Sequence, residues 1–198
     1  MNRKERKRVL LIGDSIRMHY TPIVRRKLRK SAEILIIDEN CQDSRKVKAN
    51  LLRWIDNFNA ESIDIIHFNC GLHDIKKPFD AEENQVPIEE YRQNLEDIVE
   101  ILKERTDAVL IWANTTPVIF ERHHEHKSFD RHLEDVIDYN EVARLIMEKG
   151  EIPINDLYAE LYTGRIGKYI KKDGVHLRRR GNRIIANKVA GYISDYLK

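Results

Sequence analysis

Five short, nearly continuous apolar runs constrain the fold of this chain more than any other feature. They are rich in Ile and Val and lie at Val9–Ile12, Ile34–Ile37, Ile63–Phe68, Ala108–Ala113 and Ile152–Ile154. Continuous rather than alternating hydrophobicity is typical of parallel strands that are buried on both faces. The runs therefore predict five parallel strands.

The segments between these runs have helical periodicity. Apolar residues recur every three or four positions in residues 47–58, 88–102 and 184–197. Pro22 and Pro87 are expected in first helical turns, where proline is tolerated, so a helix start is predicted at Thr21-Pro22. Strands that alternate with helices predict an α/β protein with a parallel sheet and helices on both faces. The 198 residues suit a single domain over 1–198.

Composition narrows the possible partners. The net charge of +2 gives no strong attraction to nucleic acid or to an anionic membrane, and the basic clusters at residues 3–8, 25–30 and 178–180 are interpreted as solvated faces. The two cysteines, Cys41 and Cys70, form no CxxC pattern, which disfavours a disulfide framework and a structural zinc site. Nothing approaches a membrane span in length, and no secretory leader is recognised, so we expect a cytoplasmic protein.

Ser15 follows the first apolar run directly, after Gly13 and Asp14. A serine here would be exposed at the carboxyl edge of the sheet, where such sheets place their sites. Asp14 and Ser15 could equally be a helix cap or a turn. Near the far end of the chain, Asp173 and His176 precede the last helical segment. An Asp-x-x-His loop can place a carboxylate beside an imidazole, whose other nitrogen then serves a serine hydroxyl.

A third polar segment, "HFNCGLHD", ends the third predicted strand. Gly71 permits a tight turn and a close approach to a ligand, and Asn69, His73 and Asp74 offer polar groups there. Ester hydrolysis needs hydrogen-bond donors aimed at the oxyanion, and one donor is worth about 3–4 kcal/mol. The backbone N–H of Ser15 and a side chain near Gly71 are candidates.

The sequences GDS at 13–15, GLHD at 71–74 and DGVH at 173–176 resemble blocks one, three and five of the SGNH (GDSL) hydrolase family. The resemblance covers nearly the whole chain. It implies a flavodoxin-like, three-layer αβα sandwich and serine ester hydrolysis without a metal or cofactor. By the same resemblance Ser15 is the nucleophile, His176 the general base and Asp173 the partner that orients it.

The chain departs from the family pattern at two places. His73 stands where block three usually has an asparagine that donates to the oxyanion; a neutral imidazole could donate instead, and Asn69 is an alternative donor. The segment Asp38–Ser44 lacks the usual block-two glycine, so the backbone N–H of Cys41 or Gln42 is expected to replace it. This combination of motifs resembles a bacterial branch of the family associated with acylated sugars.

The other candidate residues lie at strand ends or in the least regular segment. Thr115 and Thr116 follow the fourth run and, with Asp14, Asn69 and Asp74, are expected to contact substrate. The histidine-rich segment 117–130 is interpreted as a mobile loop over the site rather than a zinc site, since no carboxylate or cysteine pattern accompanies it.

Three functions fit these residues. The leading hypothesis is a serine esterase that removes small acyl groups, such as acetyl, from a carbohydrate or a related small-molecule ester. An O-acyltransferase would use the same triad with another acceptor. A non-catalytic carbohydrate-binding module would explain His73 and the missing glycine, although it has no need of all three triad residues.

Overall fold

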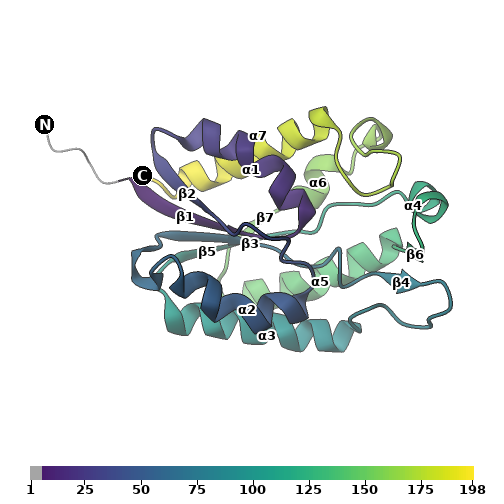
Figure 1. Cartoon of the computed structure of the whole chain (residues 1–198), viewed down its shortest axis with the longest axis horizontal. Coiled ribbons are helices and arrows are strands. Elements are labelled where there is room, and N and C mark those ends of the chain that lie inside the picture. The colour runs from purple at the N-terminus through teal and green to yellow at the C-terminus, as the bar shows by residue number, and fades with distance from the viewer. Residues whose placement is uncertain (1–5) are drawn as a thin grey trace, which may run out of the picture.

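The computed structural model describes residues 6–198, so the basic positions among residues 3–5 lie outside the described part. A single parallel sheet forms the centre of the molecule (Figure 1). Its strands, in spatial order, are β2 (Ala32–Ile36), β1 (Lys7–Ile12), β3 (Ile65–Phe68), β5 (Val109–Ala113) and β7 (Ile154–Asn155). All four strand pairs are parallel. The five predicted strands and the α/β class are therefore confirmed.

Helices cover both faces of the sheet and make the three layers visible in Figure 1. One face carries α1 (Ser15–Leu28), α6 (Leu157–Leu161) and α7 (Arg179–Asp195). The other carries α2 (Ser44–Asp56), α3 (Ile88–Arg105) and α5 (Leu133–Lys149). The shorter elements are η1 (Ala60–Ser62), η2 (Ile166–Lys168), α4 (Phe120–His126) and the antiparallel pair β4 (Lys77–Pro78) and β6 (Phe129–Asp130).

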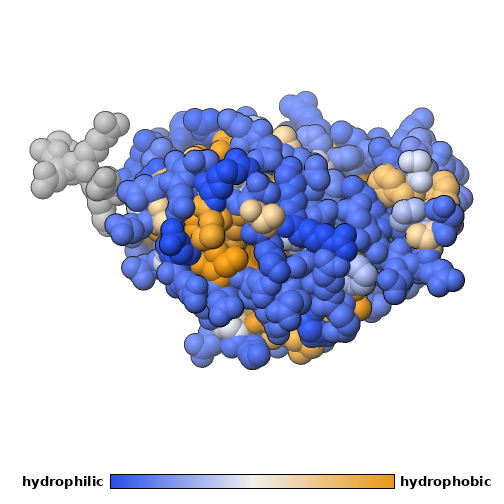
Figure 2. Space-filling model, turned by 60° about the horizontal axis from the view of Figure 1, so that its bottom comes forward, coloured by the Kyte–Doolittle hydropathy of each residue, from blue (hydrophilic) through white to orange (hydrophobic). Residues whose placement is uncertain are grey.

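The core lies between the sheet and the two helical layers. The β1 residues Val9–Ile12 are at most 1% exposed, as expected for a strand covered on both faces. Phe68 and Trp112, on neighbouring strands, pack edge to face with ring centroids 5.2 Å apart. The face shown in Figure 2 is mainly hydrophilic, with its largest hydrophobic area toward the left of the view and smaller ones toward the right and the bottom. Among the described residues, no helix combines the length and apolarity that crossing a bilayer requires.

The first helix begins earlier than the sequence predicts. α1 starts at Ser15, because the Asp14 side chain caps it by accepting a hydrogen bond of 2.8 Å from the Ile16 N–H. The predicted start at Thr21-Pro22 is therefore wrong, and Pro22 lies inside the helix. A proline removes one helical hydrogen bond, yet the cap and the buried face, which includes Tyr20, maintain the helix through it.

The histidine-rich segment is also more regular than expected. Residues 117–130 contain helix α4 and strand β6 instead of forming an irregular loop. His123 is fully buried, and the Ile119 N–H donates to the Gly174 carbonyl over 2.8 Å. The segment therefore packs against the turn that carries Asp173.

The strand order determines where a site can form. The order β2-β1-β3-β5-β7 reverses direction between β1 and β3, and ligands of such sheets bind in the crevice at the carboxyl ends of the strands beside this reversal. Ser15 follows β1, and the segment 69–74 follows β3. The Asn69 N–H donates to the Ile12 carbonyl over 3.1 Å, which brings the two segments side by side.

Candidate active site

Three side chains from opposite ends of the chain meet at the carboxyl edge of the sheet. Ser15 Oγ lies 3.0 Å from His176 Nε2, and His176 Nδ1 lies 2.8 Å from Asp173 Oδ2. The ionised carboxylate can only accept, so Nδ1 carries the proton and Nε2 accepts from the serine hydroxyl. This is the geometry in which a histidine can take the proton of an attacking serine.

Asp173 is held in its ionised form by its own turn. Its Oδ1 accepts hydrogen bonds from the backbone N–H groups of Val175 and His176, over 3.1 and 2.9 Å. Burial opposes ionisation, but the hydrogen bonds from the His176 side chain and from these N–H groups outweigh it and lower the pKa of Asp173. The carboxylate is thus charged at neutral pH and can orient the His176 ring.

Asp14 caps the helix that begins at Ser15 and does not face the solvent. It is 1% exposed, and its Oδ1 caps α1. Burial raises its pKa, although the Ile16 N–H and the charge of Arg131 oppose this. The expected contact between Asp14 and substrate is not supported by this position, whereas its role in shaping the turn before Ser15 is.

The loop after β3 combines a glycine at positive φ with a neutral histidine. Gly71 has φ of 147°, and a Cβ there would stand 2.2 Å from Thr115 Oγ1, so only glycine fits. Burial and the charges of Lys76 and Arg131 lower the pKa of His73 to about 3. His73 is therefore neutral at physiological pH and carries one N–H, as an oxyanion donor must. Its Nδ1 is buried and has no partner among residues 6–198.

Asp74 lies away from the solvent, next to α2. It is fully buried, and its Oδ1 accepts from the Ser44 N–H at the first residue of that helix, over 2.8 Å. Burial raises the pKa of Asp74 to about 7 despite this bond. The structure thus makes Asp74 a link between the β3 loop and α2 instead of the expected substrate contact.

The remaining expected substrate contacts are largely occupied by the protein itself. The Asn69 amide donates to the Ala113 carbonyl over 2.7 Å, and Thr115 Oγ1 donates to the Cys70 carbonyl over 3.2 Å. Thr115 and Thr116 are 2% and 3% exposed. Of these residues only Thr116 keeps a hydroxyl without a partner in the described structure. These side chains join the strand ends and do not line an open pocket.

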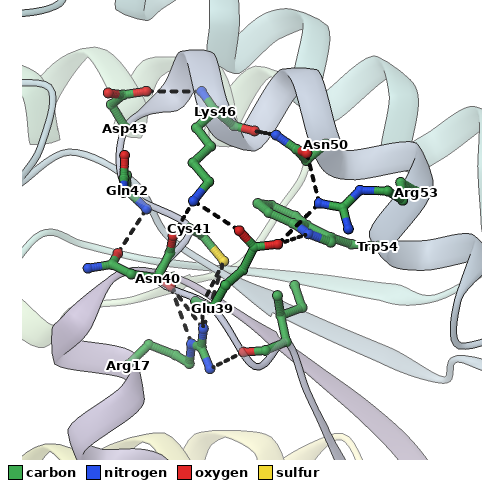
Figure 3. Close-up of polar contacts among 12 residues, drawn as sticks. Arg17, Glu39, Asn40, Cys41, Gln42, Asp43, Lys46, Asn50, Arg53 and Trp54 are labelled. Atoms are coloured by element: carbon green, nitrogen blue, oxygen red, sulfur yellow. Dashed lines mark hydrogen bonds and ion pairs between the residues drawn. The ribbon is translucent and has the colours of Figure 1, made fainter.

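The segment that replaces block two is held by the guanidinium of Arg17 (Figure 3). Arg17, on α1, donates to the carbonyls of Gly13, Ile37 and Glu39 over 3.3, 3.0 and 2.6 Å. It is 2% exposed. Its charge thus connects the nucleophile turn to the end of β2 and to the loop beyond it.

The backbone N–H of Cys41 or of Gln42 was expected to donate to the oxyanion, and the structure distinguishes between these two alternatives. The Cys41 N–H donates to the Gly13 carbonyl over 3.3 Å in a fully buried position, so it cannot reach an oxyanion. Gln42 is exposed and has φ of 58°, the backbone region that favours glycine. Its N–H donates to Asn40 Oδ1 over 3.0 Å, a side chain that a ligand could displace. The Cys41 and Cys70 thiols are buried and free, and burial raises the pKa of both.

Sequence reasoning missed two residues beside the triad. His19 lies four residues after Ser15 on α1, and its ring meets the His176 ring edge to face at 5.4 Å. The four-residue spacing would have revealed it had the helix been placed from Ser15. Arg131 is 5% exposed and sits near Asp14, Asp173 and His73, as their mutual electrostatic effects show. No motif marked it.

The histidines of α4 do not converge. His123 and His126 approach backbone carbonyls of Asp173 and Arg122, and His124 approaches Asp130. Within residues 6–198, no three His, Cys, Asp or Glu side chains gather closely enough to ligate a metal ion.

Two hollows differ in their relation to the triad. A groove of about 520 Å³ between α3 and α5 contains no triad residue. A cavity of about 10 Å³, lined in part by Ile16, Asn69, Leu72 and Thr116, adjoins the nucleophile turn. This second cavity has room for about one water molecule.

No family model and no curated protein matches the sequence. Solved structures do match its fold. A lipase/acylhydrolase from Enterococcus faecalis aligns with a TM-score of 0.80 and 16% identity, covering 97% of each chain. The acetylxylan esterase Axe2 from Geobacillus stearothermophilus aligns with a TM-score of 0.73 and 18% identity, covering 98% of this chain and 96% of its own.

A GDSL-like lipase from Bacteroides thetaiotaomicron gives a TM-score of 0.72 at 17% identity, over 96% of this chain and 88% of its own. At such identities the likeness establishes the fold alone. The chain has the SGNH hydrolase fold, as the three sequence blocks implied.

Proposed function

We propose that this protein is a serine ester hydrolase of the SGNH type. One observation carries the proposal: on this fold, Ser15, His176 and Asp173 form a continuous chain of contacts of 3.0 and 2.8 Å. Ser15 Oγ attacks the ester carbonyl as His176 takes its proton. His176 then protonates the leaving alcohol, and water activated by His176 releases the acid from the acyl-enzyme.

The negative charge of the tetrahedral intermediate needs donors near Ser15. The Ser15 N–H is at the first position of α1, where no intrahelical acceptor exists and the helix dipole favours an anion. The neutral His73 side chain is the proposed second donor. The Gln42 N–H is the proposed third donor, after the Asn40 side chain that now accepts from it has been displaced. Gly71 contributes by letting the His73 loop approach closely.

The proposed acyl group is short. Acetyl esters are the proposed substrates. The similarity to the fold of an acetylxylan esterase supports the same acyl group.

A carbohydrate is the proposed alcohol. Phe79 is 57% exposed and packs near His124, with ring centroids 5.1 Å apart, while Phe120 stacks on His132 at 4.6 Å. Helix α4 carries both Phe120 and His123, which contacts the Asp173 carbonyl. Aromatic rings that are exposed or half-buried on and beside α4, the helix that contacts the Asp173 turn, suit the apolar face of a sugar ring.

The test is hydrolysis of p-nitrophenyl acetate and butyrate by wild type and by Ser15→Ala, without added metal. Removing a triad serine costs about 10⁴–10⁶ in rate, and acetate should be preferred over butyrate. Ser194→Ala is the matched control, because Ser194 only bonds the Ala190 carbonyl within α7. Equal activity of Ser15→Ala and wild type would refute the proposal. Acetyl transfer to a sugar, with little free acetate, would instead identify a transferase.

A further inference from the structure

Arg131 is a buried cation without a carboxylate partner. It is 5% exposed, and among residues 6–198 its guanidinium forms no ion pair within 4.0 Å, although the charges of Asp14 and Asp173 act on it from farther away. Its Nε donates to the Leu72 carbonyl, and its Nη1 lies 3.3 Å from His123 Nε2. The guanidinium carbon lies 5.0 Å from the centre of the Phe129 ring. Burying a charge in this way is costly, so its position requires an explanation.

His123 continues the contact in the other direction. It is fully buried on α4, and its Nδ1 lies 3.0 Å from the Asp173 carbonyl. A carbonyl only accepts, so Nδ1 carries the proton and Nε2 has the lone pair that receives the Arg131 N–H. Burial is the main cause that lowers the pKa of His123, and Arg131 and Lys127 add to it, so the neutral form that both contacts need prevails.

These contacts join the two loops that the proposed reaction must align. Leu72 lies between Gly71 and His73, the loop proposed to hold the oxyanion, and Asp173 is the triad acid. The Asp173 turn also presses closely on α4: a Cβ on Gly174 would stand 2.5 Å from the Ile119 carbonyl and 2.6 Å from the His123 nitrogen. The path Leu72–Arg131–His123–Asp173 is therefore continuous and tightly packed.

We propose that Arg131 and His123 are positioning residues, which fix the triad acid relative to the oxyanion loop through this path. The inference rests on the proposed function, because only a working triad needs the two loops in register. A displacement of about 1 Å in such a site can cost 10²-fold in rate. Neither residue touches the reacting atoms, so both act through Asp173 and His73.

The variants separate the two contacts of His123. His123→Phe removes both, while His123→Asn keeps a side-chain N–H near the Nδ1 position and so retains the bond to Asp173. Arg131→Met removes the charge and Arg131→Lys keeps it. His126→Phe is the matched control, since His126 lies on the same helix, is exposed, and bonds only the Arg122 carbonyl, over 2.8 Å.

Two activity measurements apply: kcat and KM for p-nitrophenyl acetate, and the rate at which diethyl p-nitrophenyl phosphate labels Ser15. In His123→Phe and Arg131→Met we expect kcat and the labelling rate to fall 10- to 100-fold at nearly unchanged KM. His123→Asn should recover most of this loss, and His126→Phe should match wild type. If His123→Phe fails to fold, two variants still test the proposal. His123→Asn removes only the contact with Arg131, and Arg131→Lys keeps the positive charge without the guanidinium.

A third measurement does not depend on activity. In wild type, the proton that His176 Nδ1 shares with Asp173 should give a far-downfield proton NMR signal, which His123→Phe should shift or broaden and His126→Phe should not. Labelling of Ser15 without ester turnover would refute the proposed substrate and leave the positioning role supported. An unchanged NMR signal in folded His123→Phe would overturn the positioning role. So would rates that fall only in parallel with thermal stability, with no recovery in His123→Asn.

Discussion

Two buried arginines bind different loops of the candidate site, and their hydrogen-bond partners differ. Arg17 donates mainly to backbone carbonyls, those of Gly13, Ile37 and Glu39, and makes one longer contact of 3.8 Å to Cys41 Sγ. Arg131 donates to one carbonyl and to His123, a side chain that can be protonated. The loops around Ser15, here called the nucleophile side, are therefore fixed by bonds that do not depend on pH. The loops around Asp173 and His176, here called the base side, depend on a neutral His123. The comparison predicts that changes near Arg17 affect mainly stability and changes near Arg131 mainly the chemistry.

The largest expected effect lies on the base side. Asp173→Asn should lower kcat by about 10⁴, because an amide cannot hold the Nδ1–H tautomer of His176 that the serine requires. Asp156→Asn is the control, since Asp156 caps α6 and makes no hydrogen bond to Ser15, His176 or Asp173. Steady-state kinetics with p-nitrophenyl acetate would check this. A loss of less than tenfold for Asp173→Asn would contradict the assignment of the triad acid.

The next effect concerns stability on the nucleophile side. Arg17→Met leaves three carbonyls without their charged donor and should lower the free energy of unfolding by about 3 kcal/mol or more, since each such bond contributes about 1.5–3 kcal/mol. Arg131→Met leaves two acceptors without a donor, the Leu72 carbonyl and His123 Nε2, and should cost less. Urea unfolding of both variants measures the difference. Equal losses would remove the distinction between the two sides.

Asp74 connects the two sides, and its effect should depend on pH. The pKa of Asp74 is raised to about 7 in the folded protein, above its ordinary value near 4. The contribution of this carboxyl to the free energy of unfolding is therefore complete below pH 4 and is lost as the pH rises to 7. The stability of Asp74→Asn relative to wild type should therefore increase from pH 4 to 7, at up to about 1.4 kcal/mol per pH unit, and then stay level.

Urea unfolding at pH 5 and pH 8 is the measurement. Asp195→Asn, at the exposed end of α7, is the control and should show no such increase. A pH-independent difference between Asp74→Asn and wild type would show that the carboxyl is not desolvated as the structure indicates.

The smallest expected effect concerns His19. His19→Ala should lower kcat by about 2- to 10-fold, because the edge-to-face contact that restricts the His176 ring is worth about 0.5–1.5 kcal/mol. His19→Phe keeps an aromatic edge in place and should remain close to wild type. Comparison of the two variants tests whether packing, rather than the imidazole itself, is responsible.

Much of the fold could be read from the chain because parallel strands are buried on both faces and leave continuous apolar runs. The start of α1 could not, since Pro22 suggested a first turn while the cap that begins the helix is Asp14. Similarly, α4 was not expected in the polar segment 117–130. Its buried contacts come from the distant Asp173 turn, which no local pattern reveals.

The sequence by itself determined the α/β class, the five strands and the three residues that meet as Ser15, His176 and Asp173, because these depend on local hydrophobic pattern and on motifs at strand ends. Only the tertiary structure decided which polar groups remain free. Most buried polar atoms find partners: Asp14 and Asp74 each accept a helix N-terminal N–H through Oδ1, and Asn69 and Thr115 donate to backbone carbonyls near the strand ends. Only the second carboxylate oxygens of Asp14 and Asp74, among these side chains, are buried without a partner within residues 6–198. The tertiary structure also placed two arginines where they hold the loops of the site: Arg17, two residues after the first motif, and Arg131, which belongs to no motif.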